Sequence, residues 1–191
     1  AISESIQELV RTHFFDDRWR EVIILTVEMM GEADKFFVLI FELLDEMMKK
    51  KRNLKIFLET LLNVSSSSDK LENRVKSLLF YFTCKNQRID IEEGTLYNWL
   101  LDIATLLEIE FDHLIVYRNN EKIASEEINK NYILKISNSN ELDNETKRDL
   151  LKYIKANKLL VECYITDCTL NNLAKEKIVD NILTYKNIIQ Q

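Results

Sequence analysis

Apolar residues recur at helical spacing along most of the chain. The apolar residues Leu71, Val75, Leu78 and Phe82 are separated by four, three and four residues, and similar stripes run through 54–62, 96–107 and 150–164. Such stripes predict helices that bury one face. About eight segments of this kind can be counted, so the sequence predicts an all-α, multi-helix bundle. Residues 132–136 are the exception, because their alternating pattern is as compatible with a short extended segment as with a helix.

The densest apolar stretch lies between residues 14 and 46. From Trp19 to Met30 the apolar residues occupy most of a helical wheel. A helix that is apolar all round is predicted to be the buried centre of its domain. Asp16 and Asp17 offer oxygens that cap the start of this helix, and Gly31 offers a left-handed residue at its end.

A second helix is predicted directly afterwards, with Asp34 as its cap. Its apolar positions form two adjacent rows, 36-40-43-47 and 37-41-44-48, whereas Lys35, Glu42, Glu46 and Lys49 are left for solvent. The pattern therefore predicts that the two helices form a hairpin with one solvent-exposed face. The helix that starts at Asn144 is predicted to continue to Ile165, and the other helix starts are predicted at Asn53, Ser68, Gly94 or Thr95, and Asn171 or Asn172.

The chain is long enough for one domain with a substantial core. We divide this single helical domain, residues 1–191, into an N-terminal helical hairpin (1–64), middle helices (65–140) and C-terminal helices (141–191). The four serines at 65–68 form a loop that is too short for a domain linker. Because the sequence starts at Ala1 without a methionine, we expect a fragment of a larger protein.

Two glycines and no proline in the chain exclude several classes of protein. Sandwiches and barrels need frequent turn glycines and prolines, and phosphate-binding loops need several glycines together. Gly31 and Gly94 stand alone, so the chain contains neither a P-loop nor a Rossmann fingerprint. We therefore expect no bound nucleotide or other cofactor.

The net charge of −6 argues against a general nucleic-acid surface, which needs clustered lysines and arginines. The basic run from Lys49 to Lys55 leaves two interpretations open: a local patch for nucleic acid or an acidic partner, or cations that complement a helix C-terminus. The second is the simpler. No apolar run approaches the roughly 20 residues needed to span a membrane, and we expect a cytoplasmic protein.

Residues that could carry catalysis or bind a metal are few. The cysteines, Cys84, Cys163 and Cys168, form no CxxC pair, and the two histidines, His13 and His113, lie in no known motif. Nucleophilic catalysis requires a base beside the nucleophile, and zinc requires three or four ligands. The sequence therefore predicts no catalytic residue, no metal site and no enzyme activity in this chain.

Two stretches resemble a known family. Residues 13–37, HFFDDRWREVIILTVEMMGEADKFF, resemble a segment found downstream of the ATPase core in bacterial NACHT proteins of the STAND NTPase class. Residues 150–183, LLKYIKANKLLVECYITDCTLNNLAKEKIVDNIL, resemble the terminal helical part of the same proteins. Since both stretches occur in the family's order, the chain is similar to the C-terminal helical domain of a NACHT protein.

This resemblance implies a non-catalytic regulatory or sensor domain that couples recognition of a trigger to the ATPase switch, in bacterial antiphage defence or signalling. Its implied partners are the ATPase core of the same polypeptide and a protein trigger. The chain lacks the longer alanine- and leucine-rich middle region of many family members, so the trigger cannot be transferred from them. The alternative is a free-standing helical adaptor module that binds other proteins.

The residues that match the two motifs have two interpretations. The simpler one is structural, with Trp19 and Val22 in the core, Arg18 and Glu21 in a local ion pair, and Asn157 as a buried polar support. The other is direct contact with the ATPase or a trigger, for which we select the charged residues Arg18, Arg20, Glu21, Lys152, Lys155 and Lys158. The complete motif set is Phe14, Phe15, Asp16, Arg18, Trp19, Arg20, Glu21, Val22, Ala156, Asn157, Lys158, Leu159, Leu160, Val161 and Cys163.

Overall fold

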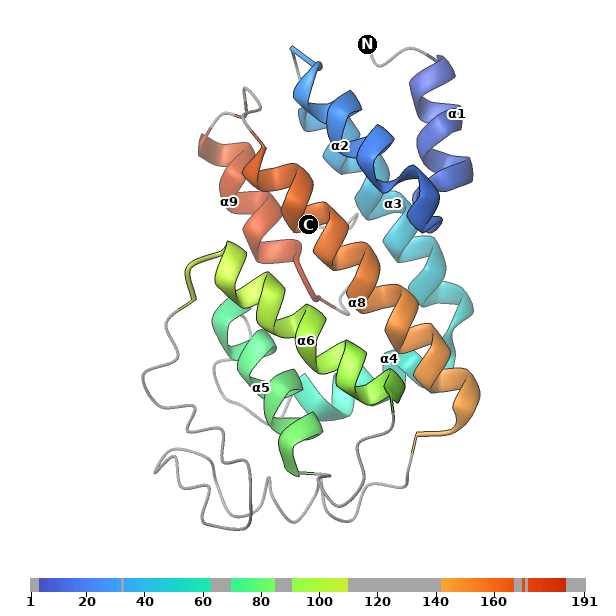
Figure 1. Cartoon of the computed structure of the whole chain (residues 1–191), viewed down its shortest axis with the longest axis vertical. Coiled ribbons are helices and arrows are strands. Elements are labelled where there is room, and N and C mark those ends of the chain that lie inside the picture. The colour runs from blue at the N-terminus through green and yellow to red at the C-terminus, as the bar shows by residue number, and fades with distance from the viewer. Residues whose placement is uncertain are drawn as a thin grey trace.

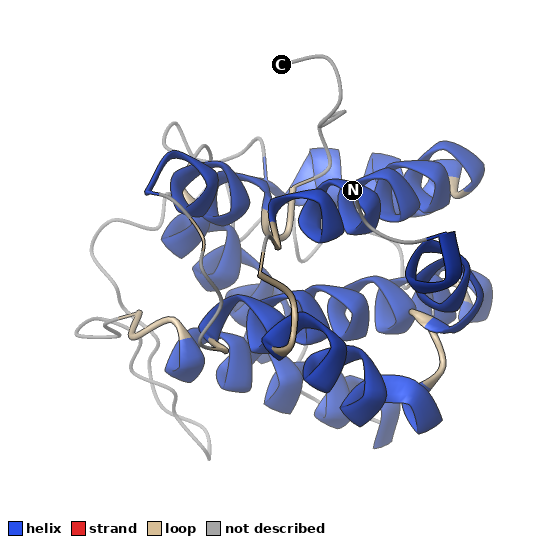
Figure 2. Ribbon diagram, turned by 90° about the horizontal axis from the view of Figure 1, so that it is seen from above, coloured by secondary structure: helices blue, strands red, loops and turns tan. Residues whose placement is uncertain are grey.

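A computed structural model describes residues 4–31, 33–62, 70–84, 91–109, 142–166, 170 and 172–184. Within these ranges all regular structure is helical, which confirms the all-α prediction (Figures 1 and 2). The elements are α1 (Glu4–His13), the 3-10 helix η1 (Asp17–Trp19), α2 (Arg20–Glu28), α3 (Asp34–Lys50), α4 (Arg52–Leu62), α5 (Leu71–Cys84), α6 (Ile91–Leu106), α8 (Asn144–Ile165) and α9 (Asn172–Asn181). Ser68, Asn171 and the alternating segment 132–136 lie outside the described residues.

Helix α3 is one of the two central helices of the bundle. It packs against α1, α4, α8 and α9. Both predicted apolar rows are buried except for Met47, which is half-buried, and Phe36 and Ile40 are fully buried. Lys35, Glu46 and Lys49 are exposed as predicted. Contacts on several sides explain why this helix buries so much of its surface.

Helix α8 is the second central helix. It runs unbroken to Ile165, as predicted, and Figure 1 shows it crossing the front of the molecule between α2 and α6, both of which it contacts. Its cap is Asp143 and not Asn144: a carboxylate oxygen of Asp143 accepts a hydrogen bond of 2.7 Å from the Thr146 backbone N–H. The prediction was wrong by one residue because Asn and Asp are equally good caps.

The prediction that the helix after Asp17 is the buried centre is wrong. In α2 only Ile23 and Val27 are buried, whereas Val22, Leu25 and Met29 are 40%, 54% and 87% exposed. The helix packs mainly against α8 and η1. A helix is buried only where other helices pack against it. This short helix is apolar on all sides but lies at the outside of the bundle.

The ends of α2 also differ from the prediction. Asp16 caps the preceding 3-10 helix, by accepting from the Arg18 N–H, and Asp17 is the first residue of that helix. No described glycine has a positive φ, so Gly31 is not a left-handed stop. The helix ends instead with the N–H groups of Met29 and Met30 bonded to the carbonyls of Leu25 and Val27.

Three other predicted helix starts are displaced. Asp34 is the first residue of α3 and follows the cap Ala33, and Asn53 lies inside α4. Helix α6 begins at Ile91, so Gly94 is inside it and Thr95 does not open it. A single glycine costs a helix only about 1 kcal/mol relative to alanine, which the burial of Leu96 and later residues of α6 outweighs.

The turn after α9 is held by three side chains from other helices. Asn157 of α8 accepts a hydrogen bond of 2.7 Å from the N–H of Leu183, which has a positive φ of 57°. The hydroxyl of Tyr153 donates to the Thr184 carbonyl at 2.7 Å, and its burial raises the pKa of this phenol. Arg74 of α5 donates to three carbonyls of the same turn region. These bonds fasten the C-terminal turn to α5 and α8.

Candidate interaction site

The two motifs from opposite ends of the sequence meet at one cavity of about 270 Å³. The end of α1, the η1 region, α6 and α8 surround it. From the first motif come aromatic and charged side chains, and from the second come three lysines. The lining residues are Phe14, Phe15, Asp16, Asp17, Arg20, Trp99, Lys152, Lys155, Ala156, Lys158, Leu159 and Glu162.

Ion pairs join the two motifs across this cavity. Arg20 donates through Nε to Glu162 Oε2 at 2.9 Å, and its Nη2 lies 2.8 Å from Oε1, so the contact is bidentate. The Glu162 side chain is only 12% exposed, and this pairing raises the pKa of Arg20. Lys155 pairs with Asp17. The start of α2 is therefore tied to α8 by charges as well as by packing.

A second group of contacts links α8 to α6. Lys158 Nζ lies 2.6 Å from Asp102 Oδ2 and 4.0 Å from Glu162 Oε1. Lys155 Nζ lies 5.6 Å from the centre of the Trp99 ring, within the range of a cation–π contact. The lysines of the second motif thus bridge three elements around the cavity.

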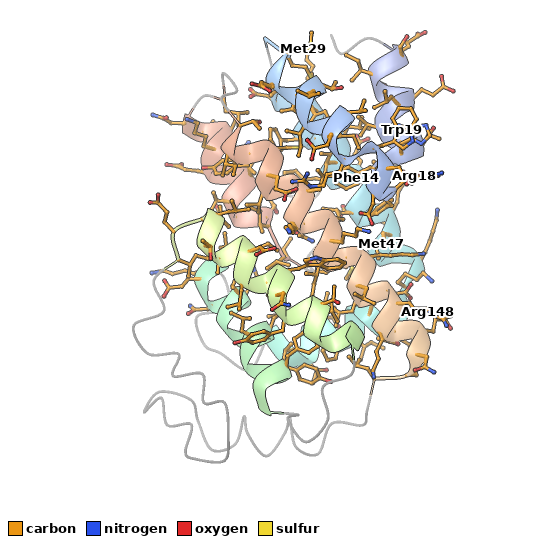
Figure 3. All side chains as sticks on the ribbon, viewed as in Figure 1. Phe14, Arg18, Trp19, Met29, Met47 and Arg148 are labelled. Atoms are coloured by element: carbon orange, nitrogen blue, oxygen red, sulfur yellow. The ribbon has the colours of Figure 1, made fainter. Side chains whose placement is uncertain are left out.

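Arg18 and Asp16 form a local pair at the solvent side of this site. The guanidinium meets the carboxylate with two close contacts, Nε to Oδ1 at 3.0 Å and Nη2 to Oδ2 at 2.6 Å, while the Arg18 side chain stays 85% exposed. These bonds, together with that from the Arg18 N–H, lower the pKa of Asp16 from 3.8 to about 2. Figure 3 shows Arg18 directed away from the bundle.

Asp16→Asn is expected to lower the free energy of unfolding at pH 7, with a difference from the unsubstituted chain that disappears in acid. The pKa of Asp16 is lower in the folded chain than in the unfolded one, so its contribution is present above about pH 4 and is lost as the pH falls toward about 2. Urea unfolding at pH 7, 4 and 2 measures this. Glu8→Gln, which removes an exposed acid from α1, is the control. A difference that does not change with pH would contradict the assignment.

The candidate contact residues divide into two groups. Arg20, Lys155 and Lys158 are engaged in the ion pairs described above, and Glu21 pairs with Arg20. Arg18, although paired with Asp16, and Lys152 are exposed, and Lys152 lines the cavity. The structure therefore gives the first group a role inside the domain and leaves Arg18 and Lys152 accessible to a partner.

The apolar residues of the motif set are mostly buried, with three exceptions. The buried members are Phe14, Ala156, Leu159, Leu160, Val161 and Cys163, and the polar Asn157 is buried as well. Trp19, predicted to be core, is only half-buried and stacks on His13 with ring centres 3.9 Å apart. Val22, also predicted to be core, is exposed, as is Phe15. Cys163 is buried and forms no disulfide, whereas Cys168 and His113 lie outside the described residues.

Sequence reasoning missed the partners of the lysines. Glu162 follows Lys158 by four residues, which is ion-pair spacing on a helix and could have indicated its role. Asp17, Asp102 and Trp99 reach the site only through tertiary folding. Arg74 was missed because a buried arginine on a helix has no periodic signal of its own.

The basic run from Lys49 to Lys55 fits the structural interpretation. Lys49 and Lys50 lie in the last turn of α3, where cations complement the helix dipole. Lys51 Nζ lies 3.1 Å from Asp149 Oδ1 and 3.7 Å from Glu145 Oε1 on α8, and the pairing raises the pKa of this lysine.

The described residues contain neither a metal-binding cluster nor a membrane-spanning helix. No group of three or more metal-binding side chains is found there. None of the helices in the described ranges is both long and apolar enough to cross a membrane.

Comparison with protein-family models identifies part of the chain. Residues 111–185 match the family model of the NACHT C-terminal helical domain 2. A search of curated proteins and a search of solved structures find no match. The matched range contains the second motif and the described helices α8 and α9, while the first motif precedes it. The match agrees with the resemblance to the C-terminal helical domains of NACHT proteins, and residues 111–185 are similar to the NACHT C-terminal helical domain 2.

Proposed function

We propose that the chain is a non-catalytic regulatory domain of a NACHT NTPase, which restrains or triggers the ATPase of the same polypeptide in bacterial antiphage defence or signalling. The observation that carries the proposal is the junction around the cavity. There, a family-like segment outside the matched range is fastened to α8 inside that range. Exposed Arg18 and Lys152 stand beside the junction and offer charge to a neighbouring domain.

The energetics of the junction suit a regulatory contact. Exposed ion pairs contribute only about 0–1 kcal/mol each, because solvent screens them. Pairs such as Lys155 with Asp17 and Lys158 with Asp102 can therefore exchange partners at low cost when another charged surface approaches. The bidentate pair of Arg20 with the nearly buried Glu162 is the stronger anchor and keeps the two motifs together.

A restraint acts only through different affinities for the resting and active ATPase. Moving an equilibrium from 1:99 to 99:1 takes about 5.5 kcal/mol, far more than one exposed charge supplies. The proposal therefore requires a contact surface of several residues. A single charge reversal on that surface should change the resting population only in part.

Lys152→Glu in the whole NACHT protein is expected to change basal ATP hydrolysis by about two- to fivefold, which corresponds to a change of up to about 1 kcal/mol. Steady-state hydrolysis with and without the trigger measures this effect. Lys177→Glu is the matched control, because it reverses an exposed lysine on α9, away from the cavity lining. Arg18→Glu should act in the same direction as Lys152→Glu.

Deletion of residues 1–191 from the whole protein tests the function as such. The regulatory role requires a change in basal hydrolysis, in assembly or in the protection of bacteria against phage. If the shortened protein hydrolyses ATP, assembles and responds to its trigger as the intact one does, the regulatory proposal is wrong. In that case the alternative, an adaptor module that binds other proteins, takes its place.

A further inference from the structure

The outer face of α2 carries a continuous apolar stripe. Val22 and Leu25 of α2 and its C-cap residue Met29, which keeps a helical backbone conformation, follow one another by three and four residues, which places them on one side of the helix. They are 40%, 54% and 87% exposed. Figure 3 shows Met29 at the outer end of α2, away from the rest of the bundle.

This stripe is unusual for the described part of the chain. Eight large apolar side chains are exposed there, and three of the eight lie on this one face. Ile23 and Val27 on the opposite side of α2 are fully buried. The helix therefore cannot rotate to bury its outer face without exposing the inner one. Clustered apolar residues on a surface mark a site of association, whereas single ones do not.

Acidic charge flanks the stripe. Glu21 and Glu28 lie two helical turns apart, about 10 Å along the axis, in the same row as Leu25. The side chain of Glu21 is 74% exposed, and Glu28 is exposed as well. Glu28 lies in the last turn of α2, which contains no basic residue and where the helix dipole is already negative. Glu21 shares Arg20 with Glu162, whereas no residue of the last turn of α2 compensates Glu28, so the negative potential of the rim is strongest at the Glu28 end.

We infer that this face is a docking site for a cationic amphipathic helix. Apolar residues of the partner at positions i, i+3 and i+7 would cover Val22, Leu25 and Met29. Lysines or arginines about two turns apart would lie beside Glu21 and Glu28. The inference rests on the proposed function in one respect, since it places the partner helix on the ATPase that the domain is proposed to regulate.

A second copy of the chain fits the face less well. If two α2 helices packed antiparallel with Leu25 on the symmetry axis, Glu21 of one copy would approach Glu28 of the other. Like charges placed together across an interface oppose association. A cationic partner removes this repulsion, and the same acidic rim then gives specificity.

Two synthetic peptides test the inference with the full chain. Both form amphipathic helices with leucines at i, i+3 and i+7, and the leucines are flanked by lysines in one peptide and by glutamates in the other. The chain is expected to bind the lysine peptide and not the glutamate peptide, as measured by fluorescence anisotropy at physiological salt. Leu25→Glu should weaken binding about tenfold or more. The double variant Glu21→Lys, Glu28→Lys should bind the glutamate peptide instead.

Leu173→Glu is the matched control. Leu173 on α9 is 64% exposed, and the substitution adds the same charge to the chain as Leu25→Glu does. Binding that is unchanged by Leu173→Glu supports the site. If both variants affect binding equally, or if the chain binds neither peptide, the inference is overturned. Dimerisation in sedimentation equilibrium that is lost in Leu25→Glu would overturn it in favour of a second copy. These results leave the ATPase measurements on the whole protein as an independent test of the proposed function.

Discussion

Asn157→Ala is expected to lower the free energy of unfolding by about 2–4 kcal/mol. Asn157 is fully buried and joins two parts of the domain: its Oδ1 accepts from the Leu183 N–H at 2.7 Å, and its Nδ2 donates to the Tyr153 carbonyl at 2.8 Å. Alanine leaves the Leu183 N–H buried without this acceptor and also leaves a cavity. Urea unfolding followed by circular dichroism measures the loss.

Asn181→Ala is the control for this prediction. Asn181 donates from Nδ2 to the carbonyl four residues earlier, that of Lys177, at 2.7 Å, which repeats one bond of Asn157 on an exposed surface. Its loss should cost less than about 0.5 kcal/mol, since water replaces the bond. If the two variants lose equal stability, the Leu183 contact does not carry the effect. Hydrogen exchange of residues 179–184 should increase in Asn157→Ala alone.

The positions of the central helices could be predicted in part from sequence. The two apolar rows run without a break from Phe36 to Met48 of the 17-residue helix α3, and a pattern of that length predicts both the helix and its buried face. The unbroken α8 was predicted for the same reason, since neither glycine nor proline interrupts it. Long, regular patterns determine local structure because each turn repeats the same preference.

The burial of α2 could not be predicted, because burial depends on neighbours. Its sequence is more apolar all round than that of α3, yet Leu25 and Met29 face solvent. The number of helices that pack around a segment is a property of the tertiary fold and not of the segment. The same limit applies to Trp19, which the pattern placed in the core and which instead stacks on His13.

The candidate site was predicted as two separate motifs, and only folding shows that they meet. Arg20 and Glu162 are 142 residues apart in sequence. Nothing in either motif specifies the other as its partner, because several acids and several cations are available to each. The lysines at 152, 155 and 158 were selected for contact with another domain, but two of them are used to join helices of this one.

Arg74→Met is expected to lower the free energy of unfolding by about 3 kcal/mol. The side chain is only 4% exposed, and its guanidinium donates to the carbonyls of Ile182, Asp180 and Val179 at 2.9, 2.8 and 3.3 Å. It thereby supplies positive charge and donors at the end of α9, where the last carbonyls lack a full set of helical partners. Chemical denaturation measures the loss, and Arg148→Met, at an exposed arginine of α8 (Figure 3), is the control.

Two opposing effects decide the size of this loss. Burying a cation costs several kcal/mol, and methionine avoids that cost while keeping much of the apolar stem. Hydrogen bonds to a charged group contribute about 1.5–3 kcal/mol each, and three are lost together, so the loss outweighs the gain. Because Arg74 and Asn157 hold the same turn, their substitutions should not be additive: the double variant should lose at least about 0.5 kcal/mol less than the sum of the two. Full additivity would show that the two side chains stabilise the domain independently, and an unchanged stability of Arg74→Met would show that solvent satisfies the α9 carbonyls.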